Sequence, residues 1–194
     1  MNLKDIIIRR RSIRRYKQTP IQETILRSVV QCGMYYPSRS NMQPLKFMLV
    51  DNKEHCKTIF ESILWGSKIS QYRIFNNYEY APAAYIIVLI DKGITHSGYE
   101  YEIGASIQNM LLCATENGLG SLWIKSINKA KLHGYFKILG NVEIDSIIAL
   151  GYSAHSSATI KYNNSTKTII DTNYNLLVPK RDQEDILFYN QYGR

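Results

Sequence analysis

The near-continuous apolar run from Ala83 to Ile90 constrains the fold more than any other stretch of this chain. It has the length of a β-strand and is too short to span a bilayer. A run without polar alternation is typical of a strand that is buried on both faces. Helices are therefore expected on both sides of the sheet that contains this strand.

Other patterns predict helices that alternate with short buried strands. Glu100–Asn117 is predicted as a long helix, because Ile103, Ile107 and Met110 recur on one face. The remaining predicted helices cover residues 3–9, 20–36, 53–65 and 129–139, and the remaining strands cover residues 46–50, 122–124 and 147–152. This alternation predicts an α/β or α+β sheet flanked by helices. Residues 66–80 are predicted as a loop or irregular helix, residues 153–168 as a loop and residues 176–194 as a tail.

Two helix starts are predicted in more detail. In the first helix, Ile6 and Ile7 are expected to face inward. Thr19 is predicted to cap the second helix, with Pro20 at its first position and Gln22 closing a capping box.

Length and charge set the broad class. A chain of 194 residues is most simply one domain. Its formal net charge of +8 favours anionic partners, and much of the excess lies between Arg9 and Arg15.

The cysteines, the histidines and the amino terminus favour a reduced, metal-free protein of the cytoplasm with no membrane segment. Cys32, Cys56 and Cys113 are odd in number and have no ligand spacing, so they are predicted to be reduced core thiols. The apolar stretch Ile6–Ile8 is too short for a secretion signal. The histidines lack metal or triad spacing and are interpreted as surface or capping residues: His55, His96, His133 and His155.

The segment from Arg9 to Arg15 contains five arginines and Ser12. Guanidinium groups repel one another but match phosphate or carboxylate oxygens with a planar set of donors. A nucleic-acid backbone, an anionic membrane surface, a phosphorylated small molecule or plain solvation would each suit such a cluster. Nucleic-acid binding is disfavoured, because no aromatic residue stands inside the cluster.

A second unusual stretch runs from Pro37 to Pro44 after a predicted helix. Ser38, Ser40, Asn41 and Gln43 offer hydrogen-bonding side chains between the two prolines. The prolines are expected to stiffen this loop and to limit the entropy that it loses on binding a ligand.

Four stretches, in this order, resemble the nitroreductase family of flavin-dependent oxidoreductases. They are Arg10-Arg11-Ser12-Ile13-Arg14, the Pro37–Pro44 loop, residues 104–121 and Ile148-Ala149-Leu150-Gly151-Tyr152. The resemblance covers about Leu3 to Tyr152, most of the chain. It implies an α+β fold of three layers, in which helices flank a central, mostly antiparallel sheet.

The resemblance also implies a site for flavin mononucleotide (FMN). Arg10, Arg11 and Ser12 would hold the phosphate, and Arg14 would lie at the pyrimidine edge of the flavin ring. Trp123 and Ile124 would lie beside one ring face, with a main-chain donor near Lys125 or Ser126 reaching N5.

In the family, the loop that corresponds to Pro37–Pro44 reaches the flavin of the opposite subunit. The resemblance thus implies a homodimer with two equivalent sites, to which the loop contributes Pro37, Ser38, Arg39, Ser40, Asn41 and Gln43. Arg39 and Tyr35 would lie near the mouth of the site. The tail 176–194, which contains several apolar residues, is expected to pack on the partner subunit.

Two positions depart from the family pattern. Members often carry a Lys-x-Arg pair that binds the phosphate after the last buried strand, and here only Lys161 stands in that region. Several members place an acidic residue near N5, where this chain has Lys125. The first change implies either that phosphate binding rests more on Arg10 and Arg11 or that Lys161 acts alone. The second would alter which substrates are held against the ring.

The expected activity is hydride transfer from NADH or NADPH to a small oxidant, such as a nitroaromatic compound or a quinone. The resemblance implies that the chemistry resides at N5 of FMN, so no protein side chain is predicted to be catalytic. One shared ring face predicts ping-pong kinetics. A flavin-binding protein without turnover and, less favoured, a nucleic-acid-binding protein are the alternatives.

Overall fold

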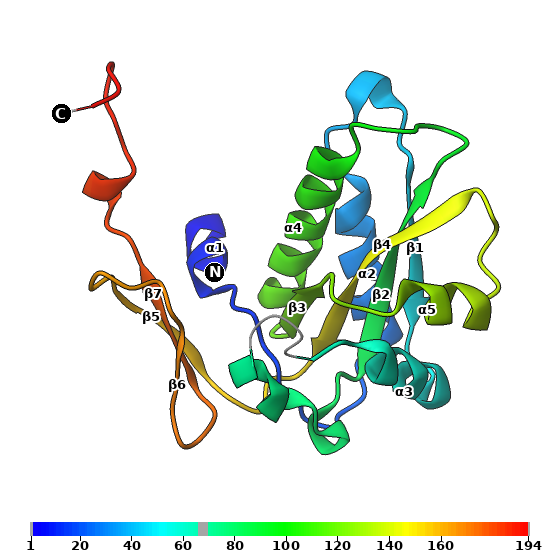
Figure 1. Cartoon of the computed structure of the whole chain (residues 1–194), viewed down its shortest axis with the longest axis horizontal. Coiled ribbons are helices and arrows are strands. Elements are labelled where there is room, and N and C mark those ends of the chain that lie inside the picture. Colours follow the sequence, from blue (N-terminus) through cyan, green and yellow to red (C-terminus); the bar gives the residue numbers. More distant parts are fainter. Residues whose placement is uncertain (1, 66–69, 194) are drawn as a thin grey trace. The chain divides into compact units, whose positions relative to one another are not determined.

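The computed structural model of this chain describes residues 2–65 and 70–193. The chain divides into two compact units, residues 1–154 and residues 155–194 (Figure 1). The first unit contains the predicted sheet and helices. The second contains most of the region that was predicted to lack regular structure.

A four-stranded antiparallel sheet forms the centre of the first unit (Figure 1). In order across the sheet, its strands are β1 (Leu45–Val50), β2 (Ala84–Asp91), β4 (Val142–Gly151) and β3 (Gly120–Ile124). All three pairs of neighbouring strands run antiparallel. The apolar run therefore forms an inner strand, and the predicted α+β fold with a mostly antiparallel sheet is confirmed.

Helices cover both faces of this sheet. The four that pack on it are α2 (Glu23–Met34), α3 (Lys53–Ser62), α4 (Glu100–Glu116) and α5 (Lys129–Tyr135). The other helices of this unit are α1 (Leu3–Arg9), η1 (Arg39–Asn41), η2 (Ser70–Phe75) and η3 (Tyr78–Tyr80).

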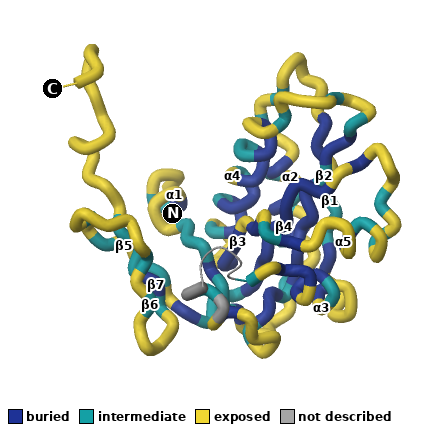
Figure 2. Tube along the Cα trace, in the orientation of Figure 1, coloured by how far each residue is buried: buried dark blue, intermediate teal, exposed yellow. Residues whose placement is uncertain are grey.

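Alternate side chains of β2 pack into two different core layers. Ile86 and Val88 belong to the cluster that includes residues of α2 and α4. Tyr85 and Ile87 belong to the cluster that includes residues of α3 and α5. Successive side chains of a strand point to opposite faces, so one apolar run supplies both layers. Figure 2 shows β2 buried along almost all of its length, whereas most of α1 is exposed.

The second helix begins later than its capping pattern predicts. α2 starts at Glu23, and Gln22 precedes it without a side-chain capping bond. Gln22 has an extended backbone, with φ −62° and ψ 135°. Before it, Gln18 Nε2 donates to the carbonyl oxygen of Ala81 at 2.9 Å, which ties this stretch to the residues before β2. In α1, Ile6 is buried as predicted, but Ile7 is exposed.

α3 also ends earlier than predicted, at Ser62. Ile63 forms an isolated bridge with Ile127, and Leu64 N donates to Ser126 O at 2.9 Å. These pairings draw the chain out of helical geometry. The predicted irregular region 66–80 contains η2 and η3, and its residues 66–69 lie outside the described residues.

The second unit contains a small sheet that the sequence did not indicate. Its strands are β5 (Ser157–Lys161), β7 (Leu176–Lys180) and β6 (Ile169–Ile170), in that order, followed by η4 (Gln183–Asp185). β5 and β7 run parallel, and β6 and β7 run antiparallel. The predicted tail thus begins with a strand of this sheet. Its last residue, 194, lies outside the described residues.

A pair of glycines lets residues 12–18 cross the end of the main sheet at close range. Gly120 of β3 and Gly151 of β4 stand opposite each other. A Cβ atom on Gly120 would lie 2.9 Å from Ile13 Cβ, and one on Gly151 would lie 2.7 Å from Tyr16 Cδ1. Both distances are too short for real contacts, so the crossing requires glycine at both positions.

The crossing predicts that Gly151→Ala destabilises the protein. Tyr16 is fully buried, so its ring has little room to move away from the added methyl group. Such overpacking typically costs about 1–3 kcal/mol of unfolding free energy, which urea denaturation would measure. Gly104→Ala is the matched control, because a Cβ there meets nothing within 4 Å. Equal stability of the Gly151→Ala variant and the wild type would contradict this account.

Candidate cofactor site

The arginine segment (residues 9–15) lies against the edge of β3. Ile13 N donates to Ser121 O at 2.9 Å, and Ser12 forms a parallel bridge with Ser121. Ile13 is buried between the arginines. Arg9 is exposed, and the other polar residues of the segment are partly exposed: Arg10, Arg11, Ser12, Arg14 and Arg15. The structure thus holds the predicted phosphate-binding residues together beside one strand.

Aromatic rings fix two of these guanidinium groups. Arg14 Cζ lies 4.3 Å from the centroid of the Tyr72 ring, and Arg15 Cζ lies 3.6 Å from that of Tyr80. Arg14 Nη1 also donates to Ser12 O at 3.2 Å. A cation over a ring face is attracted by the electron density of that face. These contacts restrict the side chain of Arg14 before any ligand arrives.

Burial and mutual repulsion disfavour the positive charges of the arginine segment. Burial lowers the pKa of Arg10, and the neighbouring positive charge of Arg11 lowers it further. Burial also lowers the pKa of Arg14, although Tyr72 and Tyr16 oppose this effect. Guanidinium groups nevertheless remain protonated in proteins. A bound phosphate would offset both the burial and the repulsion, so the segment fits an anionic group.

Trp123 provides a large aromatic surface on the same strand. Its side chain is 38% exposed, while the other residues of β3 are buried. The indole Nε1 donates to Ser146 Oγ of β4 at 2.9 Å, which fixes the ring. Ile124 packs into the core layer of α3 and α5, on the opposite face of the strand. Only Trp123 of this predicted pair therefore presents its side chain outward.

Lys125 is tied to a buried carboxylate that the sequence did not single out. Its Nζ lies 3.4 Å from Asp145 Oδ1. Asp145 sits at a β-bulge, because Val88 pairs with Ser146 while Leu89 pairs with Ile144. Its Oδ2 is buried and has no hydrogen-bond partner among the described residues. Bulges often direct a side chain toward a functional site. Ser126, next along the chain, is partly exposed.

Three residues of the Pro37–Pro44 loop have left-handed backbone conformations, which glycine adopts most easily. Ser40, Asn41 and Gln43 have φ angles of 51°, 55° and 49°. The left-handed region is unfavourable for side chains with a Cβ, and Asn tolerates it best. Gln43 Nε2 donates to Asn41 Oδ1 at 2.9 Å, and Gln43 N donates to Ser38 Oγ at 2.9 Å. The loop is therefore held by its own polar side chains.

Glu102 attaches this loop to α4. It is buried in the first turn of the helix. Ser38 Oγ donates to Glu102 Oε2, and Arg39 N donates to Glu102 Oε1, both at 2.9 Å. A buried carboxylate is stable only when hydrogen bonds replace its water. The sequence signal for Glu102 is weak: it directly precedes Ile103, where the apolar face of the helix begins, and it shares the first turn with the exposed Glu100.

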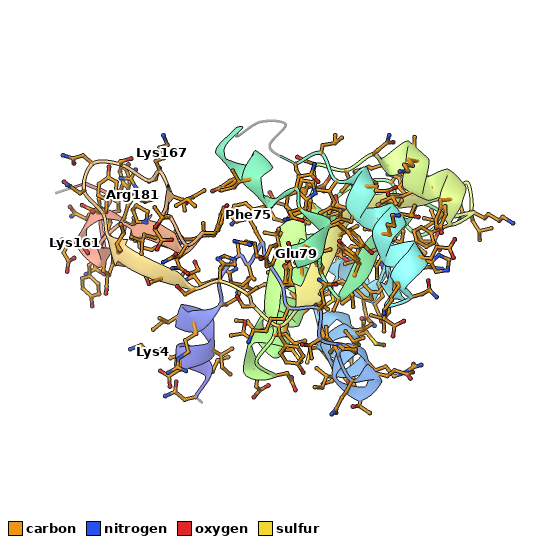
Figure 3. The ribbon with its side chains drawn as sticks, turned by 90° about the horizontal axis from the view of Figure 1, so that it is seen from below. Lys4, Phe75, Glu79, Lys161, Lys167 and Arg181 are labelled. Carbon is orange, nitrogen blue, oxygen red and sulfur yellow. The ribbon has the colours of Figure 1, made fainter. Side chains whose placement is uncertain are left out.

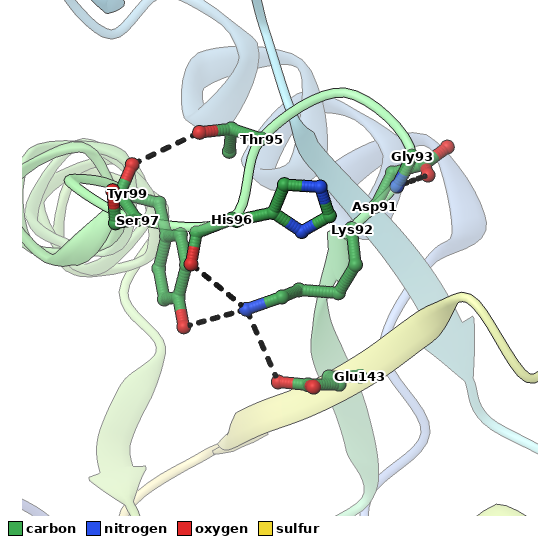
Figure 4. Close-up of polar contacts among 8 residues, drawn as sticks. All are labelled: Asp91, Lys92, Gly93, Thr95, His96, Ser97, Tyr99 and Glu143. Carbon is green, nitrogen blue, oxygen red and sulfur yellow. Dashed lines mark hydrogen bonds and ion pairs between the residues drawn. The ribbon is translucent and has the colours of Figure 1, made fainter.

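The connection between β2 and α4 is fastened by a second polar network (Figure 4). Lys92 Nζ donates to His96 O at 3.2 Å and to Tyr99 Oη at 3.1 Å, and lies 3.7 Å from Glu143 Oε2. The hydrogen bond with Tyr99 raises the pKa of Lys92. Tyr99 directly precedes α4, so these contacts help to fix the helix start that carries Glu102.

The loop and the arginine segment lie at opposite ends of the sheet. Pro44 O accepts from Asp91 N at the last residue of β2. Tyr16 N, just after the arginine segment, donates to Tyr80 O, shortly before β2 begins. The length of β2 separates the two ends by about 25 Å at the usual rise per residue. Within one chain, the loop residues and Arg10–Arg14 are therefore not brought together.

Lys161, the remaining predicted residue, belongs to the second unit. Its Nζ lies 3.5 Å from Asp182 Oδ2. Figure 3 shows Lys161 together with Lys167 and Arg181 in this unit. Arg181 Cζ lies 4.8 Å from the centroid of the Tyr162 ring. Lys161 thus takes part in a local ion pair.

The described part of the chain shows neither a metal centre nor a membrane span. Its His, Cys, Asp and Glu side chains form no group of three or more that could hold a metal ion. None of its helices has the length and apolar character needed to cross a bilayer. Among the histidines, His155 is buried rather than on the surface, with Nδ1 3.1 Å from Ser156 O. His55 Nδ1 lies 2.9 Å from Tyr135 Oη.

The contacts of Glu102 predict that Glu102→Ala loosens the loop. Two hydrogen bonds to a carboxylate are lost, which is expected to lower the unfolding free energy by about 2–4 kcal/mol. The amide of Arg39 should then exchange its hydrogen faster. Glu100→Ala, an exposed position in the same turn, serves as the control and should cost less than about 1 kcal/mol. Unchanged exchange at Arg39 would show that Glu102 does not hold the loop.

Comparison with known proteins agrees with this geometry. An archaeal relative from Archaeoglobus fulgidus, provisionally named an NADH dehydrogenase or NAD(P)H nitroreductase, is 27% identical over 154 residues, which cover 76% of this chain and 83% of the relative. A provisionally named nitroreductase of Desulfovibrio desulfuricans, solved in complex with FMN, has a TM-score of 0.73 at 21% identity. That alignment covers 100% of this chain and 99% of the other. An FMN-dependent nitroreductase of Clostridium difficile has a TM-score of 0.71 at 20% identity and is aligned over 96% of this chain and 98% of its own.

These two solved structures show the common fold. The family itself is shown by the model of the nitroreductase family, which matches residues 7–152. The match includes the whole arginine segment, the Pro37–Pro44 loop, Glu102 and all four strands of the main sheet. The resemblance predicted from the sequence is confirmed, and the chain belongs to the nitroreductase family.

Proposed function

We propose that this protein is an FMN-dependent oxidoreductase that takes hydride from NADH or NADPH and passes it to a small organic oxidant. The observation that carries the proposal is the position of the arginine segment beside β3. Its Ser12 pairs with Ser121, and the exposed Trp123 follows Ser121 by two residues on the same strand. Relatives named as NAD(P)H nitroreductases and neighbours solved with FMN support it. A location in the cytoplasm is part of the same proposal.

Arg10, Arg11 and Ser12 would bind the phosphate of FMN. Their donors lie on consecutive residues, and guanidinium groups form strong, charge-assisted bonds with phosphate oxygens. Burial and mutual repulsion make Arg10 a poor isolated cation, so an anion gains from binding there. Lys161 is paired with Asp182, which favours Arg10 and Arg11 as the main phosphate ligands.

Arg14 and Trp123 would act on the flavin ring. The bound FMN would supply the hydride chemistry, so no protein nucleophile or general base is required. Arg14, restrained by Tyr72 and Ser12, would place a fixed positive charge at the pyrimidine edge and favour the reduced, more negative cofactor. Trp123, fixed through Ser146, would lie beside a ring face, and the main chain near Lys125 or Ser126 would donate toward N5.

The Pro37–Pro44 loop would complete the site of a second copy of the chain. It lies at the far end of the sheet from Arg10 and Ser12 of its own chain, so both sets reach one FMN only if two chains meet. The proposed assembly is a homodimer with two equivalent sites. We also propose that residues 1–194 act as one FMN-binding domain, and that residues 176–194 pack on the partner subunit.

The proposal predicts a yellow protein that releases FMN on denaturation and turns over by a ping-pong mechanism. Reductant and oxidant would use the same exposed ring face in turn, so initial-rate plots at several oxidant concentrations should give parallel lines. The oxidant panel should contain quinones and both neutral and carboxylate-bearing nitroaromatics, because Lys125 adds a largely exposed cation beside Trp123.

Arg10→Ala should weaken FMN binding at least about tenfold. Arg27→Ala, an exposed arginine on α2, is the control.

Each failure has its own meaning. A colourless protein that does not take up added FMN would overturn the proposal. A protein that binds FMN but is not reduced by NADH or NADPH would instead be a flavin-binding module without this turnover. Intersecting lines in the initial-rate plots would contradict only the use of one ring face by both substrates, and the proposed oxidoreductase activity would stand.

A further inference from the structure

Cys32 and Cys113 are far apart in sequence but lie on the packed helices α2 and α4. Ser28 Oγ of α2 lies 3.8 Å from Cys113 Sγ of α4, and Cys32 follows Ser28 by one helical turn on the same face of α2. Both cysteines line one cavity of about 420 Å³, together with residues of α1. Leu3 and Tyr35, which also line it, are 65% and 77% exposed, so the cavity reaches the surface of this unit. No role in FMN binding is proposed for either thiol.

A close helix crossing brings the two thiols together. A Cβ atom on Gly33 would lie 2.6 Å from Met110 Cγ, and Ser106 Oγ donates to Gly33 O at 2.6 Å. Glycine at this point lets the side chains of α4 reach the backbone of α2. Cys32 directly precedes Gly33, and Cys113 follows Met110 by one helical turn. The placement of the two thiols beside one cavity is thus a consequence of how the two helices pack.

The two sulfurs have different surroundings. Cys32 is partly exposed, whereas Cys113 is buried. Burial raises the pKa of Cys113 to about 11. Asn117 Nδ2 donates to Cys113 Sγ at 3.7 Å, and Ser28 Oγ lies 3.8 Å from it. Cys32 is therefore the thiol that an oxidant meets first, and Cys113 is the partner held in place behind it.

We propose that Cys32 and Cys113 form a redox-active pair that hydrogen peroxide converts into a disulfide within one chain. The Cys32 thiolate attacks one peroxide oxygen, the O–O bond breaks, and Cys32 becomes a sulfenic acid while hydroxide leaves and takes up a proton as water. Cys113 sulfur then attacks Cys32 sulfur, the S–S bond forms, the S–O bond breaks and a second water leaves. Two thiols are oxidised and one peroxide is reduced to two waters.

The placement of both thiols on packed helices beside one cavity favours this outcome over further oxidation. A neighbouring thiol held in position reacts as if it were present at very high concentration, so the sulfenic acid is captured early. The disulfide would join α2, which precedes the Pro37–Pro44 loop, to α4, which holds this loop through Glu102.

Cys56 is an internal control within the same chain. It lies on α3, in the other core layer, where its thiol donates to Val50 O at 3.5 Å. Burial raises its pKa to about 12. It should therefore stay reduced under conditions that oxidise the pair.

The test is peptide mapping of the full chain after peroxide treatment. Reduced protein is exposed to hydrogen peroxide, denatured with an alkylating agent, digested without reductant and analysed by mass spectrometry. The expected result is a cross-linked pair of peptides containing Cys32 and Cys113, lighter by two hydrogens, with Cys56 alkylated. Dithiothreitol should restore both thiols. The Cys56→Ser variant should form the same cross-link, and the Cys32→Ser and Cys113→Ser variants should not.

Three results would overturn the proposal. They are oxygen added to Cys32 without a cross-link, a cross-link that involves Cys56 or joins two chains, and no oxidation of the pair. The wild-type map alone distinguishes these results, so the test does not depend on whether the serine variants fold.

Discussion

The candidate site depends on the contact between residues 12–18 and the glycine pair at the end of the sheet. Five arginines in seven residues repel one another, and isolated they would remain solvated. Here Ile13 is buried between them against Gly120, and Tyr16 is fully buried against Gly151. Tyr16 Oη also donates to Ile13 O at 2.6 Å. Apolar burial and main-chain hydrogen bonds thus hold the charges beside β3, where an anion can offset their repulsion.

The predictable part of the fold is the part set by local pattern. The apolar run 83–90 predicts an inner strand, because a short segment without polar alternation is typical of a strand that is buried on both faces. The long helix followed from its 3.6-residue period, and α2 ended just before Pro37 as that proline requires. The arginine segment and the Pro37–Pro44 loop were identified as unusual stretches from residue type alone.

What the sequence did not reveal depends on contacts between distant residues. The helix does not start at the capping pattern of Thr19: Gln22 is extended, and Gln18 is tied to the distant Ala81 by a hydrogen bond. Glu102 and Asp145 are single acidic residues whose importance appears only when Ser38 and Lys125 lie beside them. The placement of Cys32 and Cys113 beside one cavity depends on a helix crossing at Gly33, and the strands of residues 155–194 are short and partly exposed, so their pattern is weak.

The central consequence of the geometry is that one chain holds the two halves of the proposed site apart. β2 lies between them, and Glu102 fixes the loop at one end while the glycine pair fixes the arginines at the other. Both halves are rigidly attached to the same sheet, so a hinge within the unit is not expected to bring them together. A second copy of the chain can bring a loop to the arginine segment of the first.

The most direct test is to complement two defective chains. One chain carries Arg10→Glu, which would repel the phosphate, and the other carries Ser40→Ala with Asn41→Ala. The two are co-expressed with different affinity tags, and the mixed dimer is purified through both. If two chains build each site, the mixed dimer contains one intact site and should bind one FMN, while neither homodimer binds FMN well. A mixed dimer that binds no FMN, or failure to recover any mixed dimer, would contradict a site built from two chains.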